Sequence, residues 1–261
     1  MTAPPKALTE SVLRRLTIDA VSTFLGQAAD YEAAGRPGVQ LALSNEPIAD
    51  MNMLIAGGGA REDHFRAMAG RCLDREIPFL AILFPDAADR LEAGCSALGL
   101  LYATEWPIMV RGDVALNPAG NSDVTVGRAS TVEDAHGSAD VLVSAYSMPR
   151  ESVLRVLPPS YFESPGTDVY LARLGGETVG TVTLTYHGDT CGIWAMGTDT
   201  SRQRNGIGRR LLSTAMSEAR RHGIRRFFLG ATPAGFRLYE SLNFKTVCSA
   251  RVWVSGVTHQ A

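Results

Sequence analysis

The feature of this sequence that most limits its possible folds is a glycine-containing loop between a strand and a helix. A strand-like segment ends near Thr198, and Gly206 and Gly208 then open a helix with an apolar stripe at helical spacing. The first N–H groups of a helix have no partner within it, and the helix dipole places partial positive charge there. Glycine also lets a ligand approach the backbone closely. The sequence therefore predicts an anion site, particularly for a phosphate, at this helix start.

The charges around the loop support this interpretation. Arg204, Arg209 and Arg210 place cations at the helix start, where they oppose the dipole unless an anion is bound. The alternative is an ordinary surface turn that precedes an arginine-rich helix. A Walker loop is excluded because no Gly-Lys-Ser/Thr follows, and a dinucleotide-binding fingerprint is disfavoured because the third glycine is missing.

Two motifs carry a resemblance to a known family. The run from Gln203 to Gly208 reads QRNGIG and resembles the Q/R-x-x-G-x-G/A signature of the GNAT superfamily of acyltransferases. A later helix with Tyr239, Asn243 and Phe244 is similar to the family's Leu-Tyr-x-x-x-Gly-Phe pattern. Asn243 replaces the usual glycine, but asparagine also tolerates the left-handed conformation at a helix end. The two motifs together are more specific than either alone.

This resemblance implies an acyl-CoA site. The strand at 196–198 would bind the pantetheine arm and splay from the strand at 225–230, and backbone N–H groups of the loop would hold the pyrophosphate. Gly197, within a strand, fits a bulge or a close approach by ligand. The residues so implied in binding acetyl-CoA are Met196, Gly197, Thr198, Gln203, Arg204, Asn205, Gly206, Ile207, Gly208 and Arg209.

The resemblance also implies a catalytic role for Tyr239, as the general acid that protonates the CoA sulfur. The structural alternative is an aromatic side chain that packs its helix against the sheet. No general base stands out, and Asp189, His187 and Glu133 remain candidates. A lone strand cysteine such as Cys191 is mostly a small core residue. Trp194 and Tyr146 either line an acceptor pocket or belong to the core.

The chain is long enough for two domains. Residues 1–112 alternate strands and helices, starting with a helix from Thr9 to about Ala34, and predict an α/β domain. Residues 113–123 are rich in Gly, Pro, Asn and Ser and predict a linker. The resemblance implies that residues 124–261 form a GNAT domain. The expected fold is α+β, a mixed, mostly antiparallel, splayed sheet flanked by helices, with a second α/β domain at the N-terminus.

The N-terminal domain has its own glycine run after a strand. Gly57 to Gly59 precede a helix, but the segment fails the GNAT pattern, and Glu62 stands where a dinucleotide loop needs glycine. Acidic residues suit a helix start that binds no anion. We expect this domain to be a diverged GNAT-like half that does not bind acyl-CoA and that shapes the acceptor site or the domain interface.

Bulk composition excludes several classes of protein. With 45% hydrophobic and 20% charged residues the chain is typical of globular proteins, and its net charge of −2 predicts no attraction to nucleic acid or anionic membranes. No apolar run is long enough to span a bilayer, and no signal peptide is evident, so a cytoplasmic location is expected. The scattered cysteines and histidines predict neither disulfides nor a metal site; the cysteines are Cys72, Cys95, Cys191 and Cys248.

The resemblance thus implies a metal-independent N-acetyltransferase that moves the acetyl group of acetyl-CoA to a primary amine of a small molecule or peptide. The alternative is a protein that binds or senses acyl-CoA without catalysis. The sequence has no acidic cluster that would indicate a polyamine or an aminoglycoside as the acceptor. Monomer and homodimer both remain open.

Overall fold

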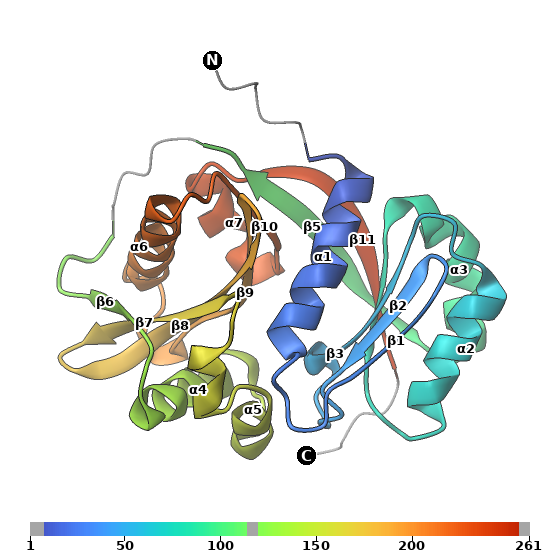
Figure 1. The fold of residues 1–261 in the computed structure, drawn as a ribbon, viewed down its shortest axis with the longest axis horizontal. Helices are drawn as coiled ribbons and strands as arrows, with labels where there is room; N and C mark the ends of the chain where they lie inside the picture. The colour runs from blue at the N-terminus through green and yellow to red at the C-terminus, as the bar shows by residue number, and fades with distance from the viewer. Residues whose placement is uncertain (1–7, 114–119, 256–261) are drawn as a thin grey trace.

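A computed structural model describes residues 8–113 and 120–255. Within them the chain forms one eleven-stranded sheet flanked by helices (Figure 1). The strands are β1 (Glu32–Arg36), β2 (Val39–Leu43), β3 (Asn52–Ala56), β4 (Leu80–Leu83), β5 (Leu101–Arg111), β6 (Thr125–Arg128), β7 (Thr167–Leu174), β8 (Glu177–His187), β9 (Thr190–Thr198), β10 (Arg226–Gly230) and β11 (Lys245–Val254). The helices are α1 (Glu10–Leu25), α2 (Glu62–Leu73), α3 (Pro85–Ala97), α4 (Val132–Tyr146), α5 (Arg150–Val156), α6 (Ile207–Arg221) and α7 (Pro233–Ser241), with short 3-10 helices η1 (Ala49–Met51), η2 (Pro159–Glu163) and η3 (Thr200–Arg202).

The strand order in the sheet is β1-β2-β3-β4-β11-β5-β10-β9-β8-β7-β6. Two neighbouring pairs, β3 with β4 and β9 with β10, run parallel, and the other pairs are antiparallel. This confirms the predicted mixed, mostly antiparallel sheet.

The sheet contains the same arrangement twice. In β1–β4 and again in β7–β10, two antiparallel pairings are followed by one parallel pairing. In each set a helix joins the parallel strands, α2 in the first and α6 in the second, and another helix follows, α3 or α7. We call α1–α3 with β1–β4 the N-terminal half, and α4–α7 with β6–β10 the C-terminal half.

The last strand of each repeat crosses into the other half. β5 follows α3 in sequence but pairs with β10, while β11 follows α7 but pairs with β4. The two crossing strands also pair with each other, from Leu101 opposite Val254 to Val110 opposite Lys245 (Figure 1). The predicted boundary between domains therefore stays a prediction, and sheet pairing crosses it. Residues 114–119 of the predicted linker lie outside the described residues.

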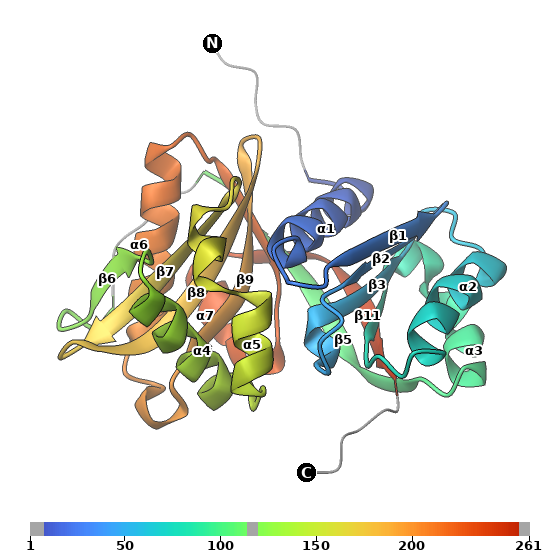
Figure 2. The same cartoon turned by 60° about the horizontal axis from the view of Figure 1, so that its bottom comes forward.

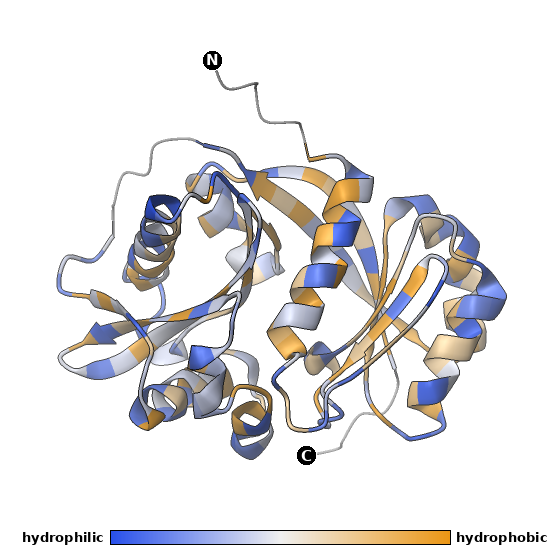
Figure 3. Ribbon diagram, in the orientation of Figure 1, coloured by the Kyte–Doolittle hydropathy of each residue, from blue (hydrophilic) through white to orange (hydrophobic). Residues whose placement is uncertain are grey.

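Helix α1, at the inner side of the N-terminal half, faces the C-terminal half in both views (Figures 1 and 2). It packs against β2 on one side and β8 and β9 on the other. Figure 3 shows hydrophobic and hydrophilic residues alternating along α1 and α2, as amphipathic packing requires. The Arg155 guanidinium on α5 adds an ion pair between the halves, 2.6 Å from the buried Glu46 carboxylate.

One predicted element is wrong. The helix expected from Thr9 to about Ala34 ends at Leu25, and the residues after Glu32 form strand β1. Their composition suits a helix, but Pro37-Gly38 makes a turn that pairs β1 with β2. Strand pairing here outweighs local helix propensity.

Candidate functional site

The parallel strands β9 and β10 separate along their length. They pair from Thr190 to Gly192 of β9 against Arg226 to Phe228 of β10, and the pairing stops there. Beyond that point β9 continues beside β8, and β10 continues beside β5. A gap therefore opens between the two strands, and the edge of β9 that faces it has no strand partner. This is the splay expected from the resemblance.

A bulge lies on β9 where the gap opens. Ala195 has a φ of 43°, which is strained for a residue other than glycine, and the register with β8 shifts beside it. The Tyr146 hydroxyl at the end of α4 donates to the Met196 carbonyl. A Cβ on Gly197 would lie 3.1 Å from the Ala145 Cβ, so glycine here permits close approach of α4. A bulge was one of the two alternatives for Gly197, and the bulge lies just before this residue.

The glycine loop presents a row of unused donors. Among the described residues, no protein acceptor meets the backbone N–H groups of 203–209, and the first N–H of this helix to be bonded is that of Arg210. Gly206 precedes α6 with a φ of 74°. The Gln203 amide donates to the Thr198 carbonyl at 3.3 Å, which ties the loop to β9. The N–H groups are thus free to bind an anion.

These residues line a groove of about 560 Å³ that leads to the gap. The structure brings nine of the ten predicted binding residues to this groove, which are Met196, Gly197, Thr198, Gln203, Arg204, Gly206, Ile207, Gly208 and Arg209. Asn205 is the exception, because its side chain turns back and donates to the Arg202 carbonyl at 3.2 Å. The Arg209 guanidinium reaches Ser241 of α7, with its Nη2 2.5 Å from the Ser241 Oγ.

Tyr239 lies at the inner end of the groove. The Thr232 side chain caps the start of α7 by accepting from the Gly235 N–H. Asn243, which stands where the family usually has glycine, follows the helix with a φ of 64°, the left-handed conformation expected of it. The Tyr239 hydroxyl is 3.7 Å from the Met196 Sδ, across the gap. Burial raises the pKa of Tyr239, so its hydroxyl stays protonated at neutral pH.

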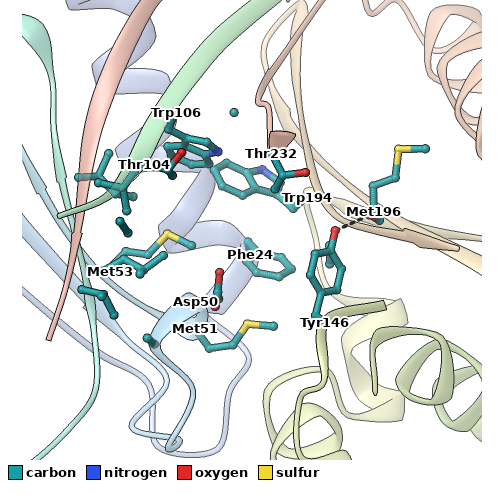
Figure 4. Close-up of a pocket in the computed structure, with 18 of the residues that line it drawn as sticks. Phe24, Asp50, Met51, Met53, Thr104, Trp106, Tyr146, Trp194, Met196 and Thr232 are labelled. Carbon is teal, nitrogen blue, oxygen red and sulfur yellow. Dashed lines mark hydrogen bonds between the residues drawn. The ribbon is translucent and has the colours of Figure 1, made fainter. Parts of the chain in front are cut away.

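A second cavity of about 400 Å³ opens on the other side of the gap. It shares four lining residues with the groove, which are Tyr146, Met196, Thr232 and Tyr239. Both halves build its walls, as Figure 4 shows. Trp194 and Tyr146 line it, as one of the two alternatives left open by the sequence has them, and Trp194 also belongs to the hydrophobic core. The N-terminal half and β5 add residues that sequence reasoning did not find, which include Phe24, Asp50, Met51, Met53 and Trp106.

Aromatic packing fixes the cavity wall. The Trp194 indole donates to the Thr185 hydroxyl at 3.0 Å and stacks on Phe24 with a centroid distance of 5.8 Å. Trp106 of β5 lies against the backbone of Gly230, where any Cβ would overlap its indole ring. Glycine at the end of β10 therefore makes room for Trp106 beside the gap.

None of the three candidate bases lines the groove or the cavity. Asp189 is paired with Arg226, and His187 precedes it at the same end of the sheet. That end is six residues from Met196 along β9, or roughly 20 Å. Glu133 is exposed near the start of α4, at the far end from Tyr146. Cys191 is fully buried, and burial raises the pKa of its thiol, which excludes a reactive thiolate.

The N-terminal half has the corresponding loop, but its own side chains fill it. The Asp86 carboxylate accepts from the Gly58 N–H at 2.7 Å and from Arg14 at 2.8 Å. A Cβ on Gly58 would overlap the Arg14 guanidinium. The N–H groups of Gly57 and Ala60 are also bonded within the protein. An internal carboxylate thus takes the place that an external anion could occupy.

The N-terminal half also lacks the gap and the tyrosine. β3 and β4 stay paired from Met53 to Ala56, through the last residue of β3. At the end of α7 the Phe244 N–H donates to the Tyr239 carbonyl. At the end of α3 the corresponding bond runs to the carbonyl of Cys95. Cys95 is fully buried, and burial raises its pKa to about 12.

Among the described residues, no group of three or more His, Cys, Asp or Glu side chains is placed to hold a metal ion. No helix in this part of the chain is long and apolar enough to cross a membrane.

Residues 140–244 match the sequence model of the Acetyltransferase (GNAT) family. The chain carries a GNAT acetyltransferase domain. The matched segment includes the bulge, the glycine loop and Tyr239, and it ends before β11. The resemblance seen in the sequence is confirmed. No curated protein matches this sequence significantly.

Solved structures extend the likeness to nearly the whole chain. A GCN5-related N-acetyltransferase from Kribbella flavida is 16% identical with a TM-score of 0.71, over 97% of this chain and 98% of that one. A functionally unknown conserved protein from Staphylococcus epidermidis is 14% identical with a TM-score of 0.63, over 87% and 94%. A tandem GNAT protein from the clavulanic acid biosynthesis pathway is 15% identical with a TM-score of 0.56, over 83% and 78%. At these identities the likeness establishes the fold.

Proposed function

We propose that this GNAT protein transfers an acetyl group from acetyl-CoA directly to a primary amine. The observation that carries the proposal is the gap between β9 and β10, which joins a groove with free N–H donors to an apolar cavity. A thioester and an acceptor would meet there from opposite sides. Tyr239 lies at the junction and lines both spaces.

The groove fits the donor in three parts. The free N–H groups of 203–209 suit a pyrophosphate at the start of α6. The unpaired edge of β9 suits a pantetheine arm, which carries amide groups that can bond a strand edge. The gap near Met196 then receives the thioester. Arg204, which lines the groove, adds positive charge near the phosphates.

The reaction needs few groups from the protein. The neutral amine attacks the acetyl carbon, a C–N bond forms, and the C–S bond breaks as the CoA thiolate leaves. Tyr239 donates its proton to the sulfur, and the proton lost from the attacking nitrogen restores the phenol through water. The apolar walls keep bulk water from competing with the amine.

The second candidate function is acyl-CoA binding or sensing without catalysis. The groove alone would be enough for it. We favour catalysis because the groove continues through the gap into a cavity, and a sensor needs no such second space.

Two measurements test the proposal. Calorimetry with acetyl-CoA measures donor binding, and release of CoA thiol with a panel of primary amines measures transfer. The proposal expects both. Binding without transfer to any amine would favour the sensor, and no binding by the folded protein would reject both functions.

A further inference from the structure

If acetyl transfer is the function, we infer that Asp50 binds the ammonium group of the acceptor. We further infer that the acceptor is a primary amine with one positive charge and an apolar, ring-bearing body. The inference rests on the proposed function and concerns the cavity between the halves. This cavity is open to the gap at Met196 and Tyr239.

Asp50 is a carboxylate that faces the cavity without a cationic partner. It lies in η1, between β2 and β3, and Figure 4 shows its side chain between Met53 on one side and Phe24 and Tyr146 on the other. Its surface is exposed to the cavity, but the protein around it desolvates the carboxyl group and raises its pKa. No described Arg, Lys or His side chain forms an ion pair with it.

Both carboxylates that are buried among the described residues are paired. The Glu46 carboxylate meets Arg155, and Asp134 meets Arg173 and two backbone N–H groups. Asp50 is open to the cavity, and a ligand that fills the cavity would take away its remaining water. A carboxylate desolvated in this way is costly to keep ionised without a partner, and a cation of the ligand would supply one.

The other residues that line the cavity indicate which chemical groups the rest of the ligand carries. Asp50 and the phenols Tyr146 and Tyr239 are the titratable side chains among the lining residues, and none of these residues is Arg, Lys or His. The other walls are mainly apolar, with Trp106, Trp194 and Phe24 among them. Aromatic faces attract both apolar rings and ammonium groups.

Three common classes of amine fit this cavity poorly. A free amino acid would bring a carboxylate close to Asp50 with no cation to neutralise it. A polyamine would bring further charges, and the lining offers one carboxylate. An aminoglycoside would place many hydroxyls against apolar walls, where they lose their bonds to water. A monoamine with an apolar, ring-bearing body is compatible with all of the lining residues.

Asp50 also provides a place for the first proton. An ammonium group cannot attack the thioester until it loses one proton, and ionised Asp50 can accept it and become neutral. The resulting free amine then attacks the acetyl carbon as described above. Desolvation raises the pKa of this carboxyl, which makes it a better proton acceptor than an aspartate with the usual pKa.

The experiment measures amine binding separately from catalysis. Wild-type protein saturated with CoA is titrated separately with 2-phenylethylamine, L-phenylalanine and spermidine, and calorimetry measures each affinity. We expect 2-phenylethylamine to bind at least about tenfold more tightly than the other two ligands. Equal or reversed preference, or no binding of the monoamine, would overturn the inference about the acceptor.

Two matched variants test the role of Asp50. Asp50→Asn removes the charge at nearly constant shape and should weaken 2-phenylethylamine binding at least about tenfold, with CoA affinity unchanged. Glu133→Gln removes a charge outside both spaces and should change neither. Unaltered amine affinity in Asp50→Asn would sink the inference. If the wild-type protein does not bind CoA at all, the result would instead count against the proposed function.

Discussion

The N-terminal and C-terminal halves share one topology and differ at the positions where a ligand would bind. In the C-terminal half the parallel strands separate, the glycine loop leaves its N–H groups free, and Tyr239 faces the gap. In the N-terminal half the strands remain paired, Asp86 fills the loop, and a buried cysteine replaces the tyrosine. The fold therefore survives where the site does not, because packing and strand pairing sustain it without the ligand.

The comparison also assigns the N-terminal half a different task. It supplies one wall of the cavity, including Asp50 and Phe24, and sends β5 across to pair with β10. A deletion of residues 1–112 would remove β5 and expose the edge of β10. Such a truncation would therefore damage the C-terminal half itself, and point variants are the better probe of either half.

The largest expected effect comes from a charge placed in each glycine loop. Gly208→Asp places a carboxylate in the groove, where its Cβ meets Leu238, Met196 and Thr198, and should weaken acetyl-CoA binding by at least about a hundredfold, or about 2.7 kcal/mol. Gly59→Asp places the same charge in the N-terminal loop, where a Cβ has no neighbour within 4 Å but the φ of 88° strains any residue other than glycine, so thermal unfolding must show that the variant is folded. It should leave affinity unchanged in calorimetry. Weaker binding in Gly59→Asp would break the comparison.

Corresponding residues at the ends of α7 and α3 should behave differently. Tyr239→Phe removes the proton donor and should lower kcat by about 10²-fold with little change in acetyl-CoA affinity. Cys95→Ala should instead cost about 1 kcal/mol of stability and leave kcat unchanged. Steady-state kinetics and thermal unfolding of both variants decide the matter. Unchanged turnover in Tyr239→Phe would reject its role as an acid.

A smaller effect is expected from the carboxylate that fills the N-terminal loop. Asp86→Asn weakens the bonds to Arg14 and the Gly58 N–H, so we expect a loss of about 1 kcal/mol, reduced by the partial exposure of both side chains. Acetyl-CoA affinity should not change. A gain of a second binding site would show that the loop is blocked by Asp86 alone and that the closed strands matter little.

The smallest expected effect is a dependence of stability on pH that is caused by Asp50 of the N-terminal half. Burial raises its pKa, so the folded chain holds this proton to higher pH than the unfolded chain does. Stability therefore falls as pH rises from the usual aspartate range through the folded pKa. Asp50→Asn should lack this loss and unfold at a slightly higher temperature at pH 7, with the difference vanishing in acid. Melting curves at several pH values test this, and a less stable variant at pH 7 would contradict it.

Local patterns in the sequence pointed to the residues that line the groove. The QRNGIG loop and Tyr239 lie within one continuous segment with a strand, a helix start and two glycines, and their roles stay predictions. Asn243 takes the left-handed conformation expected of it. Asn205 is the one predicted binding residue that the structure turns away from the groove.

The acceptor side could not be predicted in this way. Trp106 lies at the cavity because β5 crosses to pair with β10, and Asp50 lies there because the two halves meet at the cavity. Such long-range contacts leave no local signal in the sequence. The same applies to β1, whose residues suit a helix until Pro37-Gly38 pairs them with β2. The sequence likewise could not show that the Asp86 carboxylate accepts from the Gly58 N–H, because the two residues are far apart along the chain.

The stoichiometry of acetyl-CoA binding tests the central claim most directly, because the two halves share a fold but only one has an open site. Isothermal titration of the full chain should give one acetyl-CoA per chain, and Gly208→Asp should abolish the heat of binding. Two molecules per chain, or binding that persists in the variant, would show that the N-terminal half retains a donor site and would contradict this account.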